Sequence, residues 1–343
     1  MEAKVYQFYA AALSGLEEVV ADELKGRLAE LSEVRLERGK RQGRVFFTHR
    51  RSPRLLLDLR TPLSVCGLLG QVRGITVGRP GLDRLLAQLA RVDLEAAQRL
   101  LRACEPEARA GRFQLSVTLQ GAHRFSKSQL ARGFQAQLEQ AGLKAGQGRG
   151  LLRLQLHVEG GRALLGVQLG LNRADRCLEQ GGIGGPLASC LGRLLPATGN
   201  EVLLALGCSR AGAAELAAAG QRGALIALGP QAGIGEQVWA VRGDPQCLPP
   251  AAGSADLVLA AGLGPPFHPW LAELTRVLHP GGVAALLAGE SRPLAAVLGA
   301  CGEFALLAGL PIILKGRRHT LWMLERLGDP EPLLQIAGPG PGG

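Results

Sequence analysis

Apolar and polar residues alternate along the first 73 positions with the two periods that mark strands and helices. The predicted elements are strands over 5–9, 44–48 and 64–69 and helices over 16–28 and 55–59. Ser14 and Glu17 have the spacing of a capping box, which indicates that the longer helix begins there. The order strand–helix–strand–helix–strand predicts a small ferredoxin-like α+β domain over residues 1–73.

The next hundred residues use the same periods in a different order and predict an α/β domain over residues 74–171. The predicted elements are helices over 82–102 and 126–138 and strands over 113–119, 152–158 and 163–169. In the strands over 113–119 and 152–158 apolar and polar residues alternate, as in a sheet with one buried face. The turn Glu159-Gly160-Gly161-Arg162 predicts that the last two strands form a hairpin.

Residues 172–186 are polar and rich in glycine, and we interpret them as a linker. Over residues 187–328 apolar runs alternate with helical patterns, which predicts a Rossmann-like domain with a mostly parallel sheet. Its predicted strands are 201–206, 223–228, 238–241, 256–261 and 282–288, its helices 187–195, 212–219, 269–278 and 291–299, and its antiparallel edge 310–315 with 319–325. We expect the tail, residues 329–343, to be disordered.

Composition narrows the class of protein. The chain has 343 residues, and its apolar fraction of 47% excludes a wholly disordered protein. No apolar run is long enough to cross a membrane, and the first residues lack a signal-peptide pattern, so we expect a cytoplasmic protein. The seven cysteines include no CxxC pair and the six histidines are scattered, so we expect neither a disulfide framework nor a metal site.

The positive charge is concentrated in the first half of the chain. Residues 1–180 carry 29 Lys and Arg against 18 Asp and Glu, whereas residues 181–343 carry 10 against 11. A basic excess in one half is typical of a surface that binds nucleic acid, and it also occurs in soluble basic domains without that role.

Two segments of the C-terminal half resemble class I S-adenosylmethionine methyltransferases. Residues 270–283, which end a predicted helix at His-Pro-Gly-Gly, are similar to the stretch before the fifth strand of that fold. Residues 242–260 are similar to the stretch that leads into the fourth strand. There the resemblance places Asp244 beside the adenine of the cofactor, although an Asp before Pro245 also suits a turn.

The N-terminal half resembles THUMP-containing tRNA methyltransferases, and the similar segments follow the family's order over residues 5–326. They are Phe8-Tyr9 with Ser14 to Glu17, Gly43 to Phe47, Phe113 to Phe134 and Leu164 to Arg173. The resemblance implies a ferredoxin-like domain, a THUMP domain and a methyltransferase domain. It also implies S-adenosylmethionine as cofactor and the N2 atom of a tRNA guanosine as methyl acceptor.

In that family the THUMP domain holds the acceptor end of tRNA, and exposed bases and phosphates suit cations and aromatic rings. The candidate RNA-binding residues here are His123, Arg124, Lys127 and Arg132, extended by Arg112, Lys144 and Arg149. Phe125 either stacks on a base or packs in the core with Phe134. Each cation could instead be an ordinary solvated surface residue.

The cofactor motif departs from the family's pattern. The family's Asp-Pro-Phe-Cys-Gly-Ser-Gly-Thr corresponds to residues 205–212, where Gly207, Cys208 and Gly212 are the remaining candidates for cofactor contacts. Ser209 and Ala211 replace glycines that allow close approach of the cofactor. The strand over 223–228 also ends without the carboxylate that would hold the ribose hydroxyls.

The catalytic motif is altered as well. The family's Asn-Pro-Pro-Phe or Asp-Leu-Pro-Phe corresponds to Gly264-Pro265-Pro266-Phe267, which lacks a side chain that accepts a hydrogen bond from the target amine. Phe267 could stack on a flipped base, whereas Pro265 and Pro266 also suit a stiff loop.

Three hypotheses follow from these residues. The first is a tRNA-binding protein of this family whose methyltransferase domain is non-catalytic and serves as a scaffold or protein-partner surface. The second is an active guanosine-N2 methyltransferase that uses S-adenosylmethionine. The third is a basic protein with no RNA role. Three features of the family's motifs are missing: the glycine turn, the ribose carboxylate and the acceptor for the target amine. Their loss favours the first hypothesis.

Overall fold

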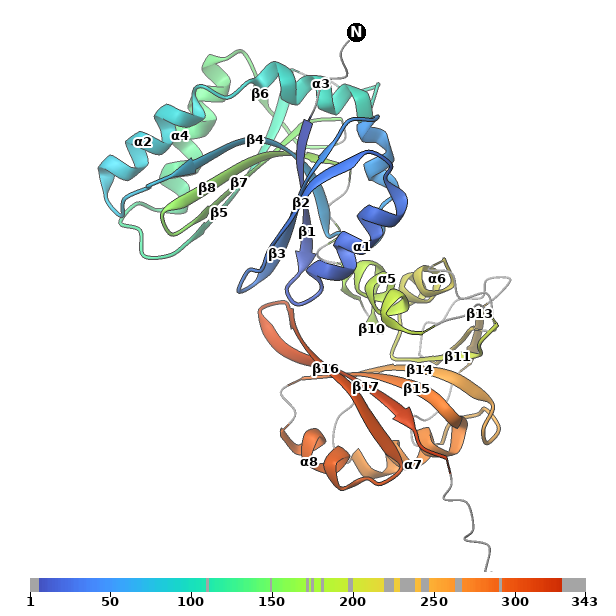
Figure 1. The fold of residues 1–343 in the computed structure, drawn as a ribbon. Coiled ribbons are helices and arrows are strands. Elements are labelled where there is room, and N and C mark those ends of the chain that lie inside the picture. The colour runs from blue at the N-terminus through green and yellow to red at the C-terminus, as the bar shows by residue number, and fades with distance from the viewer. Residues whose placement is uncertain are drawn as a thin grey trace, which may run out of the picture. The chain divides into compact units, whose positions relative to one another are not determined.

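The computed structural model describes residues 6–108, 111–148, 150–170, 173, 176–179, 182–196, 200–218, 225–228, 238–241, 247–262, 267–289 and 292–328. The chain divides into two compact units, Met1–Asp175 and Arg176–Gly343, and each is built around its own sheet (Figure 1). Within the described ranges, none of the helices has the length and apolar character needed to cross a membrane.

Unit 1 contains one eight-stranded sheet with the order β2-β3-β1-β4-β8-β7-β5-β6. Its strands are β1 (Tyr6–Leu13), β2 (Leu31–Glu37), β3 (Gln42–His49), β4 (Ser64–Arg73), β5 (Arg112–Gln120), β6 (Lys144–Ala145), β7 (Leu152–Glu159) and β8 (Arg162–Leu169). β4 pairs with β8 from Val65 to Arg73, so the sheet is continuous across the predicted boundary at residue 73. The division into ferredoxin-like and THUMP domains therefore stays a proposal.

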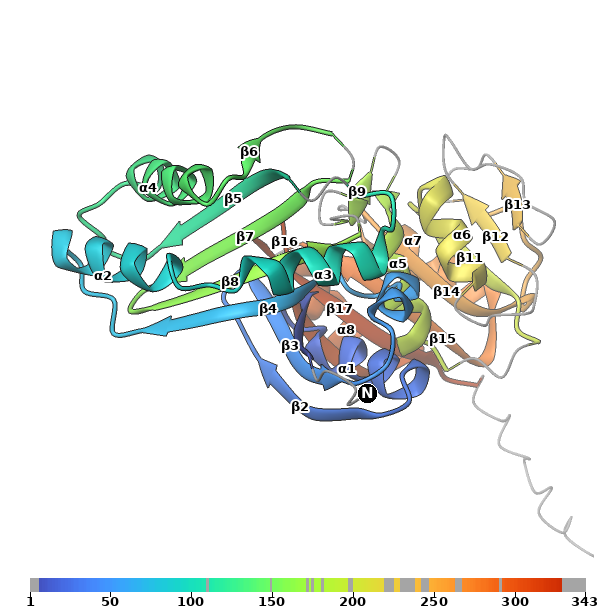
Figure 2. The ribbon, with the colours of Figure 1, turned by 90° about the horizontal axis from the view of Figure 1, so that it is seen from above.

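Helices cover one face of this sheet, as Figure 2 shows for β4, β5, β7 and β8. They are α1 (Glu17–Arg27), the 3-10 helix η1 (Pro53–Asp58), α2 (Arg79–Leu89), α3 (Leu94–Cys104) and α4 (Lys127–Gln140). The alternation in β7 explains the burial, because Leu152, Leu154, Leu156 and Val158 are fully buried in the core under the helices. The residues between them lie on the opposite, polar face of the sheet.

Two local predictions for unit 1 are wrong, and two of its strands were not expected. The sequence of β2 lacks a regular alternation, and β6 has only two residues. The helix predicted over 82–102 is two helices, since the Asp93 carboxylate accepts a hydrogen bond from Ala96 N at 2.8 Å and starts α3 anew. Ser14 does not cap α1: its hydroxyl donates to the Gly39 carbonyl at 2.6 Å, and Leu16 is the N-cap residue.

Unit 2 contains a seven-stranded sheet with the order β13-β12-β11-β14-β15-β17-β16. Its strands are β11 (Leu203–Leu206), β12 (Leu225–Leu228), β13 (Val238–Val241), β14 (Ala255–Ala261), β15 (Leu278–Ala288), β16 (Phe304–Leu314) and β17 (Arg317–Arg326). The first five in this order pair in parallel, and β17 pairs antiparallel with both β15 and β16. The expected mixed α/β, Rossmann-like fold with an antiparallel edge is confirmed.

The helices of unit 2 are α5 (Gly185–Leu194), α6 (Arg210–Ala218), α7 (Phe267–Val277) and α8 (Arg292–Ala300). The predicted linker is partly regular, since β9 (Leu178–Glu179) and β10 (Gly182–Ile183) form a small antiparallel pair and α5 begins within it. The tail over 329–343, predicted to be disordered, lies outside the described residues.

Candidate functional sites

The strand order of unit 2 reverses between β11 and β14, and ligands of open α/β sheets bind at the carboxyl ends of such strands. Gly207 follows β11 at this point with φ +64°, a conformation that favours glycine. A Cβ at Gly207 would lie 2.5 Å from the carbonyl oxygen of Ala261, the last residue of β14. Gly207 is therefore required by the close approach of the two strand ends.

The backbone of β10 packs against the turn that follows β11. Ile183 N donates to Gly207 O at 2.8 Å, and Ser209 N donates to Ile183 O at 2.9 Å. A Cβ at Gly212 would lie 2.1 Å from Ile183 O, so this glycine makes room for β10. The predicted cofactor residues Gly207, which follows β11, and Gly212, in the first turn of α6, are thus both close to Ile183, and the protein's own backbone lies against both.

The first two side chains after Gly207 are also turned inward. The Cys208 thiol contacts Ile183 O at 3.5 Å and is buried. The buried Ser209 hydroxyl accepts a hydrogen bond from Gly212 N at 3.1 Å, which occupies a backbone donor in the first turn of α6. That donor is one of the groups with which a helix N-terminus commonly binds a ligand.

The other predicted residues of unit 2 contribute less. Asp244, Gly264, Pro265 and Pro266 lie outside the described residues. Phe267 begins α7 and is buried among the core residues of unit 2, which favours packing over stacking on a base. Within the described part of the chain, no three His, Cys, Asp or Glu residues are grouped closely enough to hold a metal ion.

The predicted RNA-binding residues of unit 1 centre on the turn between β5 and α4. Ser126 and Gln129 form a capping box that fixes the start of α4, with Gln129 N 3.1 Å from Ser126 Oγ. Arg124 and Lys127 flank the cap, are exposed, and make no ion pair with any residue that the structure describes. The two cations are therefore available to an anionic ligand.

The two rings in this turn face inward. Phe125 is buried in the core of unit 1, and its ring centroid lies 4.8 Å from that of His123. Both His123 ring nitrogens are shielded from solvent and have no hydrogen-bond partner among the described residues. Of the two interpretations of Phe125, the geometry favours core packing, and it makes His123 a weaker candidate for RNA contact than Arg124.

The structure separates the remaining candidates. Arg112 and Lys144 are register partners in β5 and β6 at the start of β5, about 26 Å from its other end at 3.3 Å per residue. Arg132 lies in α4, with Nε 3.4 Å from Ser128 O. Arg149 lies outside the described residues. We call the turn between β5 and α4, residues 121–126, the Arg124 turn. The cations at positions 112 and 144 thus form a group apart from it.

The Arg124 turn instead adjoins two arginines that the sequence did not single out. Gly160 N donates to Gln120 O at 2.9 Å, Ile75 N to Gly161 O at 2.9 Å, and Arg124 N to Val77 O at 2.8 Å. These bonds bring together the end of β5, the β7–β8 turn and the segment after β4. Arg73 and Arg162, register partners in β4 and β8, therefore lie at the same end of the sheet. Their 89-residue separation gave no sequence signal.

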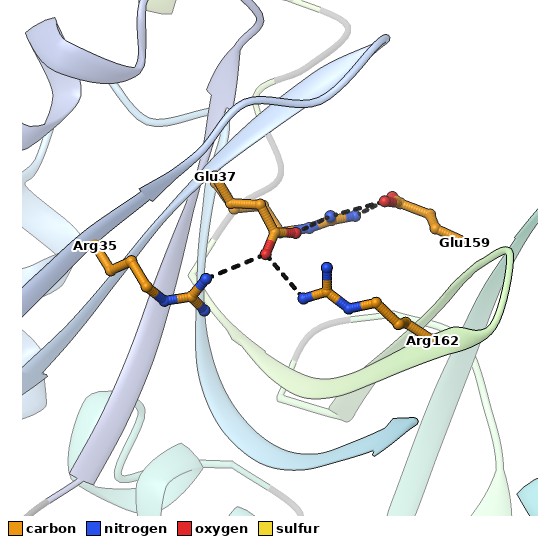
Figure 3. A network of polar contacts seen from close by, with 5 residues as sticks. Arg35, Glu37, Glu159 and Arg162 are labelled. Carbon is orange, nitrogen blue, oxygen red and sulfur yellow. Dashed lines mark hydrogen bonds and ion pairs between the residues drawn. The ribbon is translucent and has the colours of Figure 1, made fainter. Parts of the chain in front are cut away.

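A network of ion pairs crosses the polar face of the sheet at this end (Figure 3). Arg44 Nη2 lies 2.5 Å from Glu159 Oε1, and Arg162 Nη2 lies 3.1 Å from Glu37 Oε2. Glu37 also pairs with Arg44 at 3.5 Å and with Arg35 at 3.4 Å. The partners of the first two pairs stand on strands four positions apart in the sheet, about 19 Å if it were flat. The sheet is therefore strongly curled, with a concave polar face.

His157 lies on this face beside Arg44 and Glu159. Burial lowers the pKa of its imidazole to about 4, and the Arg44 guanidinium acts in the same direction. The hydrogen bond from Arg44 lowers the pKa of the Glu159 carboxyl. At neutral pH the network therefore contains a neutral His157 and an ionised Glu159.

The buried imidazole makes stability depend on pH. Because the unfolded chain binds a proton near pH 6.5 and folded His157 only near pH 4, acidification between these values favours unfolding. We expect this group to lower the free energy of unfolding by about 2 kcal/mol between pH 7 and pH 5, measured by urea unfolding. A His157→Gln variant should lose that part of the pH dependence, and an unchanged dependence would contradict the assignment.

Comparison with known proteins shows a shared fold. No protein-family model and no curated protein matches the sequence. Among solved structures, the chain is similar to TrmN from Thermus thermophilus, with 22% identity, a TM-score of 0.70, and coverage of 94% of this chain and 100% of that one. It is also similar to a predicted N6-adenine-specific DNA methylase from Listeria monocytogenes (15% identity, TM-score 0.62, coverage 95% and 97%). A third similar chain was solved in complex with SAH (11% identity, TM-score 0.63, coverage 95% and 99%).

Proposed function

We propose that this chain is a cytoplasmic tRNA-binding protein of the THUMP methyltransferase family whose methyltransferase-like unit does not use S-adenosylmethionine. The observation that carries the proposal is the pair of exposed cations Arg124 and Lys127 at the capped start of α4, which make no ion pair with the residues that the structure describes. The charge excess of residues 1–180 and the fold shared with TrmN support it. The acceptor end of tRNA, with its exposed bases and phosphates, is the proposed ligand.

The turn after β11 supports the second half of the proposal. S-adenosylmethionine needs an open glycine turn and a carboxylate that holds its ribose. The residues present supply neither, so they do not fit this cofactor. At the turn, the backbone of Ile183 lies against Gly207 and Gly212, and the Ser209 hydroxyl bonds to Gly212 N. The strand β12 ends at Leu228 without an acidic residue. Under this proposal unit 2 is a scaffold or a surface for a protein partner.

An active guanosine-N2 methyltransferase is the second candidate. The observation that favours it is the strand order of unit 2, with its switch point between β11 and β14, together with the similarity to a chain solved with SAH. In that case Asp244 would hold the adenine, since a carboxylate accepts a hydrogen bond from the adenine amine.

Binding of tRNA to the full chain tests the first half of the proposal. Neutralising phosphates with cations releases counterions, so we expect the affinity to fall steeply and log-linearly as salt rises from 50 to 200 mM. Filter binding or fluorescence anisotropy measures this slope. A chain that does not bind tRNA at 50 mM salt, or whose binding is insensitive to salt, would contradict the proposal.

A further inference from the structure

The concave face of the unit 1 sheet contains a hollow beside the ion-pair network. Its volume is about 80 Å³, which is room for several water molecules and hence for a group the size of a phosphate. The charged side chains that line it are Glu37, Arg44, Arg73, Glu159 and Arg162, with Gln71 and His157 as polar neighbours. Three arginines thus face two glutamates, and Arg35 adds a further cation on Glu37.

The glutamates are already engaged by three of these cations. Arg44 holds Glu159 through two hydrogen bonds at 2.5 and 3.3 Å, and its side chain is only 6% exposed. Glu37 is shared among Arg35, Arg44 and Arg162. With both carboxylates used and His157 neutral, the hollow keeps a positive charge that no described residue balances.

Arg73 is the cation left over. It is exposed and makes no ion pair with any residue that the structure describes. Its register partner across β4 and β8 is Arg162, and like charges directly opposite one another destabilise a sheet. An anion seated between the two guanidinium groups would remove this repulsion and gain bidentate hydrogen bonds.

The position of the hollow decides which anion suits it. Arg73 and Arg162 lie at the end of the sheet where the backbone bonds of Val77 and Gly160 hold the Arg124 turn. Three successive register pairs connect the end of β5 to Arg73: Gln120 with Glu159, Glu159 with Arg162, and Arg162 with Arg73. The end of β5 therefore lies three strand spacings, about 14 Å, from Arg73. A strand bound at Arg124 and Lys127 would need to extend only a few nucleotides to reach the hollow.

We propose that Arg73 and Arg162 bind a backbone phosphate of the RNA strand whose neighbouring nucleotides lie on the Arg124 turn. This proposal rests on the proposed tRNA binding and extends its site across the polar face of the sheet. Arg44 acts as a positioning residue, because its bonds to Glu37 and Glu159 hold the curled ends of the sheet together.

An Arg73→Ala variant of the full chain tests the phosphate site. Because Arg73 has no described ion-pair partner, its loss should leave the fold intact, which the melting temperature checks. We expect tRNA binding to weaken about fivefold, for a contact of about 1 kcal/mol, and the salt slope to fall by about one, as for the loss of one phosphate contact. Arg102→Ala is the matched control, since Arg102 is an exposed cation on α3, in the helical layer, and has no ion-pair partner in the described part of the chain.

The outcomes separate this proposal from the proposed function. If the wild-type chain binds tRNA and the Arg73→Ala and Arg102→Ala variants bind equally well, the phosphate site is wrong and the tRNA-binding function stands. If the wild-type chain does not bind tRNA, both are wrong. A lower affinity of Arg73→Ala with an unchanged salt slope would also overturn the proposal, because the residue would not be neutralising a phosphate.

Discussion

Replacing Arg124 and Lys127 together by alanine is expected to weaken tRNA binding about 30-fold at constant salt. The estimate takes about 1 kcal/mol for each of two lost contacts, and 1.4 kcal/mol corresponds to a factor of ten. The salt slope should fall by about two, because two phosphates are no longer neutralised. Anisotropy with labelled tRNA at several salt concentrations measures both quantities.

The control for this variant removes the same number of positive charges from another part of unit 1. Arg91 and Arg102 are exposed cations beside and on the helices of unit 1, and neither is ion-paired within the described residues. The Arg91→Ala and Arg102→Ala double variant also removes two positive charges, so it reports the general electrostatic effect. Equal losses in the two double variants would show that the net charge of unit 1, rather than the Arg124 turn, attracts the RNA.

No saturable binding of S-adenosylmethionine at micromolar concentration is the second large effect that we expect. A pocket without a ribose carboxylate forfeits charge-assisted hydrogen bonds of about 1.5–3 kcal/mol each. Losing two of them weakens binding about a hundredfold or more. The contacts of Ile183 and Ser209 with the turn after β11 would have to be broken to admit the cofactor more closely. Isothermal titration calorimetry with the full chain measures the binding.

Methyl transfer gives an independent readout of the same prediction. We expect no radiolabelled methyl group to appear in tRNA incubated with the chain and labelled cofactor. Micromolar binding, or label in tRNA, would contradict this prediction and support the second candidate function, an active methyltransferase. In that event Asp244→Ala should abolish the activity, because Asp244 is the only carboxylate among the predicted cofactor residues.

The sequence patterns that correctly predicted structure were those set by local chemistry. The alternation of residues 152–158 predicted the buried and polar faces of β7, and the strand–helix repeats after residue 187 predicted the parallel sheet of unit 2. Ser126 was expected to open a helix, and its capping box does so. In each case a repeat of two or 3.6 residues, or a capping box of four residues, carries the information within one segment.

Where the sequence failed, the deciding partner lay elsewhere in the chain. β2 is a strand because it pairs with β3, although its own residues alternate poorly. Ser14 bonds to Gly39 rather than capping α1, because the folded chain places that carbonyl within reach. Gly207 and Gly212, expected to approach a cofactor, are required by the backbone of Ala261 and Ile183.

The sequence by itself determined the Rossmann-like architecture of unit 2, the basic excess of the first half and the departures from the methyltransferase motifs, because these depend on composition and on short sequence patterns. Only the tertiary structure decided which cations share a surface. Strand register pairs Arg73 with Arg162, 89 residues apart in the sequence, and places both near the Arg124 turn. Arg112 and Lys144 lie at the opposite end of β5. Register is set by pairing between distant segments, and no local pattern records it.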